Sequence, residues 1–228
     1  MPRKARILVP NYPHHIVQRG HNRNAVFVAD EDYRFYLDNL KEWKTKLGIK
    51  LYAWCLMTNH IHLVIEPADD ASSVSELMKR LAGRQTAYVN KLEKRSGSLW
   101  EGRFKASPIQ RDSYLLACCR YVEMNPVRAN IVSGPRQYKW SSYSERVGLS
   151  PSSMLDYDVC YINLSNDYDA RVERYKCYLK EGASDAELEF LRTAWKRNQL
   201  TGNQQFSDEI EQRLGYRVSH RGRGKQRD

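Results

Sequence analysis

Two histidines separated by one hydrophobic residue, His60 and His62, are the residues of this sequence best suited to chemistry. They lie in a segment where polar and apolar residues alternate, which is typical of a β-strand. Because residues i and i+2 of a strand point to the same face, the two imidazoles should project side by side. Adjacent imidazoles can hold a divalent metal ion. The pair therefore predicts half of a metal site, which needs a further ligand and a reactive group.

A predicted helix over about residues 112–125 carries both missing parts. Tyr121 and Asn125 are four residues apart, so they should share one helical face. The amide oxygen of Asn125 can be a third ligand, and this set leaves positions open for a phosphate oxygen. The phenolic oxygen of Tyr121 can attack phosphorus and hold a covalent intermediate. We expect Tyr114, two turns earlier, to pack against the protein, and Glu123 to be solvated.

The elements that must position these residues follow the order β-α-β-β-α-β-α. This order predicts an α+β fold of the ferredoxin-like split βαβ type, an antiparallel sheet with helices on one face. The tyrosine-bearing helix is an addition to that pattern. The strands are predicted at residues 14–19, 50–57, 60–66 and 99–109, and the helices at about 31–47, 73–94 and 112–125.

The rest of the chain divides by composition. Beyond Gly134-Pro135 the pattern is irregular, and Ser150-Pro151-Ser152-Ser153 indicates a boundary. Three further helices are expected, at about 167–182, 184–198 and 207–214. We therefore predict a catalytic domain at residues 1–150, a helical C-terminal extension at 151–216 and a basic flexible tail at 217–228.

Charge is distributed unevenly along the chain, whose net charge is +10. Residues 1–150 hold 24 basic and 14 acidic residues, residues 151–211 hold 7 and 12, and residues 212–228 hold 6 and 1. A basic body with a basic tail is typical of a protein that binds a polyanion, nucleic acid above all. The alternative is a surface that is merely basic.

Several basic residues are candidates for nucleic-acid contact, although charge on a long surface helix often serves only solvation. Trp100 and Phe104 could stack on bases, but packing in the core is the favoured reading. His14, His15 and His21 should make hydrogen bonds or phosphate contacts and not bind metal. The candidate contacts are Arg19, Arg23, Arg84, Arg103, Lys105, Arg120, Arg128, Arg221, Arg223 and Lys225.

Cysteine usage and hydropathy exclude other classes of protein. The 5 cysteines are scattered and contain no CxxC pair, which favours reduced thiols in a cytoplasmic protein. No apolar run is long enough to cross a bilayer, so no membrane partner is expected. The basic N-terminal residues lack the apolar stretch of a signal peptide.

Two motifs together resemble the signatures of the HUH single-tyrosine transposases. They are the His60-Ile61-His62 strand and the helix Arg120-Tyr121-Val122-Glu123-Met124-Asn125-Pro126-Val127-Arg128-Ala129. The second is most similar to the branch of REP-associated tyrosine transposases. Gln18-Arg19-Gly20 and Trp100-Glu101-Gly102-Arg103-Phe104 support the resemblance, which covers about residues 5–147.

This resemblance implies a function. Its members use Mg²⁺ or Mn²⁺, held here by His60, His62 and Asn125. They cleave and rejoin single-stranded DNA through a 5′-phosphotyrosine, here on Tyr121, in DNA transposition and recombination. The REP-associated branch acts on, or binds, short palindromic repeats that fold into hairpins. Small tyrosine transposases are often dimers that exchange the tyrosine helix, whereas the long extension here favours a monomer.

Two other functions fit parts of the sequence. The first is a domesticated protein that binds DNA or RNA hairpins without cutting, because ferredoxin-like sheets also bind RNA. The histidine pair would then have no purpose. The second is a metal-dependent hydrolase that uses water, but zinc sites usually recruit a third His, Cys or carboxylate, and the candidate ligand here is an amide.

Overall fold

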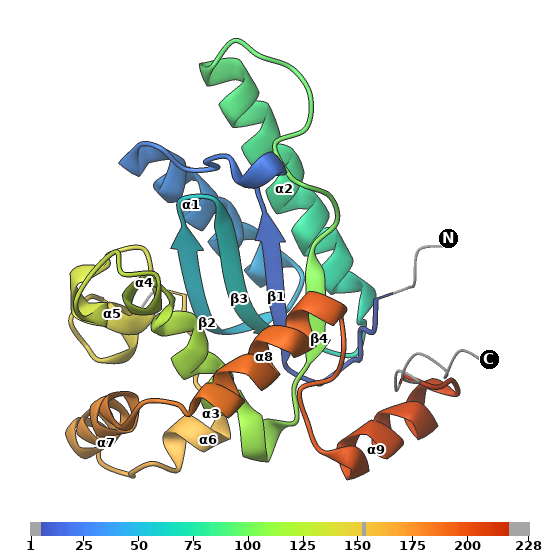
Figure 1. Ribbon diagram of the computed structural model, residues 1–228, viewed down its shortest axis with the longest axis vertical. Coiled ribbons are helices and arrows are strands. Elements are labelled where there is room, and N and C mark those ends of the chain that lie inside the picture. The colour runs from blue at the N-terminus through green and yellow to red at the C-terminus, as the bar shows by residue number, and fades with distance from the viewer. Residues whose placement is uncertain (1–5, 152–153, 219–228) are drawn as a thin grey trace, which may run out of the picture.

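A four-stranded antiparallel sheet forms the centre of the molecule (Figure 1). The structure is a computed structural model that describes residues 6–151 and 154–218. Arg221, Arg223 and Lys225 lie outside the described residues. The strand order is β2-β3-β1-β4, in which β1 and β2 flank β3. This order is that of the split βαβ pattern, and it confirms the predicted α+β class. The strands are β1 (His14–Arg19), β2 (Lys50–Met57), β3 (His60–Glu66) and β4 (Lys105–Pro108).

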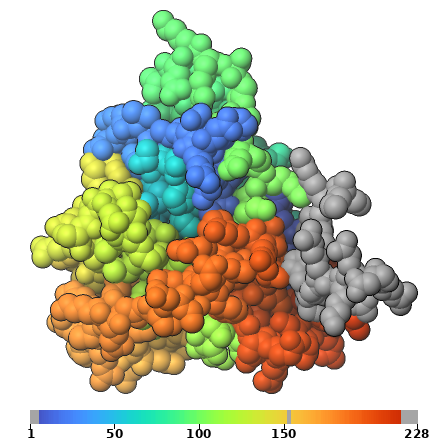
Figure 2. All heavy atoms as spheres, viewed as in Figure 1, coloured from blue at the N-terminus to red at the C-terminus, as the bar shows by residue number. Residues whose placement is uncertain are grey.

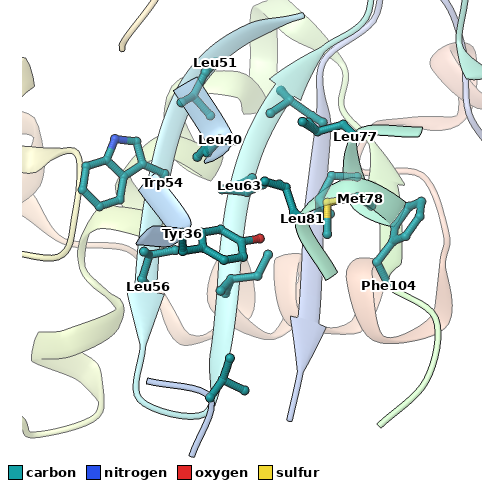
Figure 3. Packing of buried hydrophobic residues seen from close by; sticks show 14 of the residues in the cluster. Tyr36, Leu40, Leu51, Trp54, Leu56, Leu63, Leu77, Met78, Leu81 and Phe104 are labelled. Atoms are coloured by element: carbon teal, nitrogen blue, oxygen red, sulfur yellow. The ribbon is translucent and has the colours of Figure 1, made fainter. Parts of the chain in front are cut away.

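Two long helices cover one face of the sheet, behind it in Figure 1. They are α1 (Asp30–Lys46) and α2 (Ser72–Leu92), each close to its predicted range. The carboxylate of Asp32 caps the start of α1 by accepting from the amides of Val28 and Ala29 at 2.7 and 2.9 Å. Apolar residues three or four apart along both helices pack on the sheet and form the main core (Figure 3).

The opposite face of the sheet holds helices that come later in the chain. The tyrosine-bearing helix α3 (Arg111–Glu123) packs on β2 and β3, while α8 (Asp185–Arg197) packs on β4 and β1. Figure 1 shows α8, in orange, crossing in front of the sheet. The remaining helices are η1 (His21–Arg23), α4 (Asn125–Arg128), η2 (Pro135–Gln137), α5 (Tyr143–Arg146), α6 (Val159–Ile162), α7 (Tyr168–Glu181) and α9 (Gln204–Leu214).

Two predicted elements differ from the structure. The strand expected at 99–109 is reduced to β4, because Gly102 has φ 141 and interrupts the extended backbone before it. The helix expected to reach Asn125 ends at Glu123, and Asn125 begins α4. Pro126 has no N–H to donate to the carbonyl of Val122, and the Asn125 side-chain amide donates to that carbonyl instead, at 3.4 Å.

Strand register places the histidine pair as the alternation predicted. His60 lies opposite Arg19 of β1, and His62 lies opposite Val17. Both histidines therefore share the sheet face that carries α3 and α8. Among the described residues, no helix is both long and apolar enough to cross a membrane.

Candidate active site

His60 and His62 lie side by side in β3, with their ring centroids 5.0 Å apart. Nδ1 of His60 donates a hydrogen bond to Oδ1 of Asn59 at 2.6 Å. Nδ1 of His62 shares a hydrogen bond with Nε2 of His15, on the neighbouring strand, at 2.9 Å. Each imidazole of the pair thus has its Nδ1 oriented by a protein group, which leaves Nε2 as the nitrogen for another partner.

Burial keeps these imidazoles neutral. Desolvation, followed by the positive charge of Arg19, lowers the pKa of His60 to about 4. Burial lowers the pKa of His62 well below its usual value, and the neighbouring His60 and His15 act in the same direction. Burial also lowers the pKa of His15 to about 3. A neutral imidazole is the form that ligates a metal ion, so the two β3 histidines suit that role at neutral pH.

Tyr121 lies against the histidines from α3. Its ring is 6.0 Å from that of His62 and 5.6 Å from that of His15, both in edge-on orientation. The side chain is only 5% exposed. The indole Nε1 of Trp195, on α8, donates a hydrogen bond to the Tyr121 hydroxyl at 3.4 Å. The structure therefore brings the predicted nucleophile next to His62, one of the predicted metal ligands, about sixty residues before it in sequence.

Asn125 and Arg128, both on α4, lie next to Tyr121 of α3. The Arg128 guanidinium stacks over the Tyr121 ring at 4.0 Å. Its Nη2 donates to the Tyr121 carbonyl at 2.6 Å and to Oδ1 of Asn125 at 2.9 Å. The amide oxygen of Asn125 is thus engaged by a cation, and no hydrogen bond joins it to either β3 histidine in the part of the chain described. Asn125 as a third ligand stays a prediction.

The donor set fits a divalent metal ion in part. Residues 6–151 and 154–218 hold no group of three or more His, Cys, Asp or Glu side chains arranged to bind a metal. A site built on His60 and His62 would therefore need oxygen ligands of another kind, from an amide, water or phosphate. Two neutral imidazoles with open positions are compatible with Mg²⁺ or Mn²⁺ next to a phosphate.

The predicted nucleic-acid contacts fall into two groups. Arg19, Arg103 and Lys105 line a groove beside the histidines, and Arg23 is exposed on η1. Arg84 lies on α2, across the sheet, where its Nη1 donates to Asn39 at 2.6 Å and pairs with Glu42 at 2.7 Å. Arg19 lies opposite His60 in the sheet, and Arg128 stacks on Tyr121, so these two cations are next to the site.

Arg120 does not lie at a nucleic-acid surface. Its side chain is buried and pairs with the Glu187 carboxylate through two hydrogen bonds, at 2.8 and 2.9 Å. It also donates to the carbonyls of Tyr178 and Gly182. The Arg120 guanidinium therefore joins α3 to α7 and α8 and holds these helices together.

Glu123 corrects a second expectation, because it is fully buried rather than solvated. Its carboxylate accepts from the Ser142 hydroxyl at 2.6 Å, Arg146 Nε at 2.9 Å and the Tyr175 hydroxyl at 2.8 Å. Arg146 is also fully buried. The end of the tyrosine helix is therefore fixed by a buried ion pair.

Sequence reasoning missed two residues of the site. His15 was expected to make a hydrogen bond, but its partner, His62, follows only from strand pairing. Trp195 carried no signal, because it is one apolar residue of an amphipathic helix far along the chain. Packing of α8 on the sheet brings its indole to Tyr121 and within 5.9 Å of the His62 ring.

The chain also resembles known proteins in fold and in sequence. The solved structure of a REP-associated tyrosine transposase bound to a REP hairpin matches with a TM-score of 0.57 at 18% identity, over 70% of this chain and 93% of that one. A crystal structure of a candidate transposase from Deinococcus radiodurans R1 matches at 22% identity and a TM-score of 0.37, over 57% of this chain and 92% of that one. No curated protein matches the sequence. A family model described as "Transposase IS200 like" matches residues 8–125, more than half of the chain. The protein therefore belongs to the family of IS200-like transposases.

Proposed function

We propose that this protein is a metal-dependent endonuclease and strand-transferase for single-stranded DNA, acting on hairpin-forming palindromic repeats. One observation carries the proposal: Tyr121 lies against His62, which precedes it by about sixty residues, and the Arg128 guanidinium stacks on the Tyr121 ring. Because one chain supplies all of these groups, we propose that it acts as a monomer.

In the proposed reaction the Tyr121 oxygen attacks the scissile phosphorus. A bond forms between the tyrosine and the 5′-phosphate, the bond from phosphorus to O3′ breaks, and the other fragment leaves with a free 3′-hydroxyl. His60 and His62, with Asn125 as the proposed third ligand, would hold the metal ion. When bound, Mg²⁺ or Mn²⁺ polarises a phosphate oxygen. Rejoining is the reverse reaction with a different 3′-hydroxyl.

Hairpin DNA is the proposed substrate for two reasons. The body of the protein is basic, with 24 basic and 14 acidic residues in its first 150. The REP-associated transposase that shares the fold was solved with a REP hairpin bound. In this proposal Arg19 and Lys105, which line the groove beside the histidine pair, contact phosphates flanking the cleavage position.

The test is formation of a covalent adduct. The full chain is incubated with labelled single-stranded oligonucleotides that carry repeats from beside its own gene, with Mn²⁺, Mg²⁺ or EDTA. We expect a DNA–protein adduct on denaturing gels with metal and none with EDTA. Tyr121→Phe should abolish the adduct.

Tyr114→Phe is the matched control. Tyr114 is half-buried on the same helix and packs on Phe190, so its loss should leave adduct formation intact. An adduct formed by Tyr121→Phe would contradict the assignment of the nucleophile. Hairpin binding that is equal with metal and with EDTA, without an adduct in either, would instead support a protein that binds without cutting.

A further inference from the structure

A groove of about 740 Å³ opens beside the candidate active site. Arg6 and three segments line it: the end of β1, residues 101–105 before and at β4, and the end of α8 from Trp195 to Asn198. Figure 2 shows the orange surface of α8 directly below the blue and green surface of the chain around β1 and β4. The groove therefore lies where the C-terminal extension meets the sheet.

The groove shares the sheet face of the histidine pair. Arg19 lies opposite His60 in the register of β1 and β3, and Lys105 lies opposite Val17, which is itself opposite His62. Trp195 lines the groove and also donates to the Tyr121 hydroxyl. A strand bound in the groove would therefore contact Trp195, whose indole separates the groove from the buried Tyr121.

The lining is strongly cationic, with a single acidic residue, Glu101. Burial, and after it the positive charge of Arg103, lowers the pKa of Arg6. The Arg103 effect indicates that these two guanidinium groups are close together. In the described residues, Lys105, Lys196 and Arg197 are exposed, and no carboxylate lies within ion-pair distance of any of them. The basic side chains of the lining are Arg6, Arg19, Arg103, Lys105, Lys196 and Arg197.

The end of α8 is held firmly against the sheet. Asn198 ends the helix with φ 52, and its Oδ1 accepts from the Ala106 amide of β4 at 3.0 Å. The next residues continue along β4, where the Ser107 hydroxyl donates to the Gln199 carbonyl and the Thr201 amide donates to the Pro108 carbonyl. Lys196 and Arg197 are therefore fixed at the groove by their neighbours.

We propose that the C-terminal end of α8 is one wall of a groove that binds the phosphate backbone of single-stranded DNA, with Lys196 and Arg197 contacting phosphates. This inference rests on the proposed function, because it takes DNA as the ligand. Residues 151–211 hold more acidic than basic residues. In this proposal the extension nevertheless presents two cations, Lys196 and Arg197, to the DNA. The other reading of these two cations is that they only offset the negative end of the α8 dipole.

The experiment measures binding without cleavage. Fluorescence anisotropy with labelled 20-nucleotide oligothymidylate is recorded for the full chain in EDTA, over a range of salt concentrations. We expect Lys196→Ala/Arg197→Ala to weaken binding about tenfold and to reduce the salt slope by about 1.4, the value for two single-strand phosphate contacts.

Lys176→Ala/Lys180→Ala is the matched control, because it removes two cations from the last turns of α7, outside the groove. It should change affinity less than about twofold. Equal weakening by both double variants, or a lower melting temperature of the α8 variant with unchanged affinity and salt slope, would overturn the proposal. Because no metal is present, failure to form an adduct leaves this result unaffected.

Discussion

His14 is the clearest case of a side chain whose chemistry is set by burial. Its Nδ1 donates to the Tyr12 carbonyl at 2.8 Å, and its Nε2 accepts from the Val9 amide at 3.1 Å. The ring is fully buried, and burial lowers its pKa to about 4. Protonation would cost desolvation and break the bond from Val9. His14 therefore holds the chain before β1 only while it is neutral.

This arrangement predicts that the protein loses stability in mild acid. An unfolded histidine has a pKa near 6.5, so between about pH 6.5 and pH 4 the unfolded state binds more protons, and the free energy of unfolding falls as the pH falls. His14 alone should contribute a loss of about 2 kcal/mol between pH 7 and pH 5. His15, His60 and His62 add to it in the same direction. Urea unfolding at the two pH values measures the difference.

His14→Gln separates this histidine from the others. The variant should be less stable than the unmodified protein at both pH values. Its free energy of unfolding should fall by about 2 kcal/mol less between pH 7 and pH 5 than that of the unmodified protein. An unchanged pH dependence in His14→Gln would mean that His14 titrates normally in the folded protein.

At the scale of elements, α8 has a position that its own sequence does not specify. Its packing on β4 and β1 closes the face of the sheet that carries the histidines. Arg120 pairs with Glu187 near its start, and Asn198 joins its end to β4. The edge of β4 is thus covered by residues that follow α8, which protects an edge strand from pairing with another chain.

Asn198→Ala should loosen this attachment. It removes the acceptor for the Ala106 amide, which costs about 1 kcal/mol. It also places at φ 52 a residue that disfavours the left-handed backbone, which costs about 1 kcal/mol more. We expect the free energy of unfolding to fall by about 2 kcal/mol in a urea titration. Asn198→Gly should lose only about 1 kcal/mol, because glycine tolerates the left-handed backbone.

Asn130 provides a control for the backbone contribution. It also has positive φ, at 54, but its side chain is exposed. Asn130→Ala should therefore lose about 1 kcal/mol, from the backbone alone. Equal losses in Asn198→Ala and Asn198→Gly would show that the left-handed conformation carries no cost at position 198.

At the scale of the whole molecule, sequence reasoning recovered the sheet and its helices because their signals are local. Alternation in β3 predicted that His60 and His62 share a face, and apolar spacing predicted α1 and α2. The contacts that complete the site join distant segments, as His15 with His62 and Trp195 with Tyr121. No local pattern encodes such pairs, which explains why the role of α8 was missed.

Burial of charged side chains was missed for the same reason. Glu123 follows Tyr121 by two residues in an amphipathic pattern that reads as solvated, yet it is enclosed by Ser142, Arg146 and Tyr175 from three other segments. The sequence likewise did not indicate that Arg120 is buried in an ion pair, because its partner Glu187 lies 67 residues away. Charge alone does not distinguish a binding surface from a buried ion pair.

The Glu123 cluster gives a prediction for the molecule as a whole. It ties α3, which packs on the sheet, to α5 and to α7 of the predicted C-terminal extension. Glu123→Gln would leave the fully buried Arg146 without its counter-charge. Removing one partner of a buried pair costs about 3–5 kcal/mol, and we expect that loss in the free energy of unfolding. Because the cluster joins both parts, circular dichroism and tryptophan fluorescence should report one shared transition.

Glu189→Gln is the matched control for that change. Glu189 pairs with Arg192 at 3.1 Å, but its side chain is 61% exposed. Solvent screens such a pair, so the free energy of unfolding should change little in this variant. A loss in Glu123→Gln as small as that of the control would show that the Arg146 charge is compensated without Glu123. Two separate transitions would show that the extension and the sheet domain unfold independently, against the coupling that α8 and the Glu123 cluster predict.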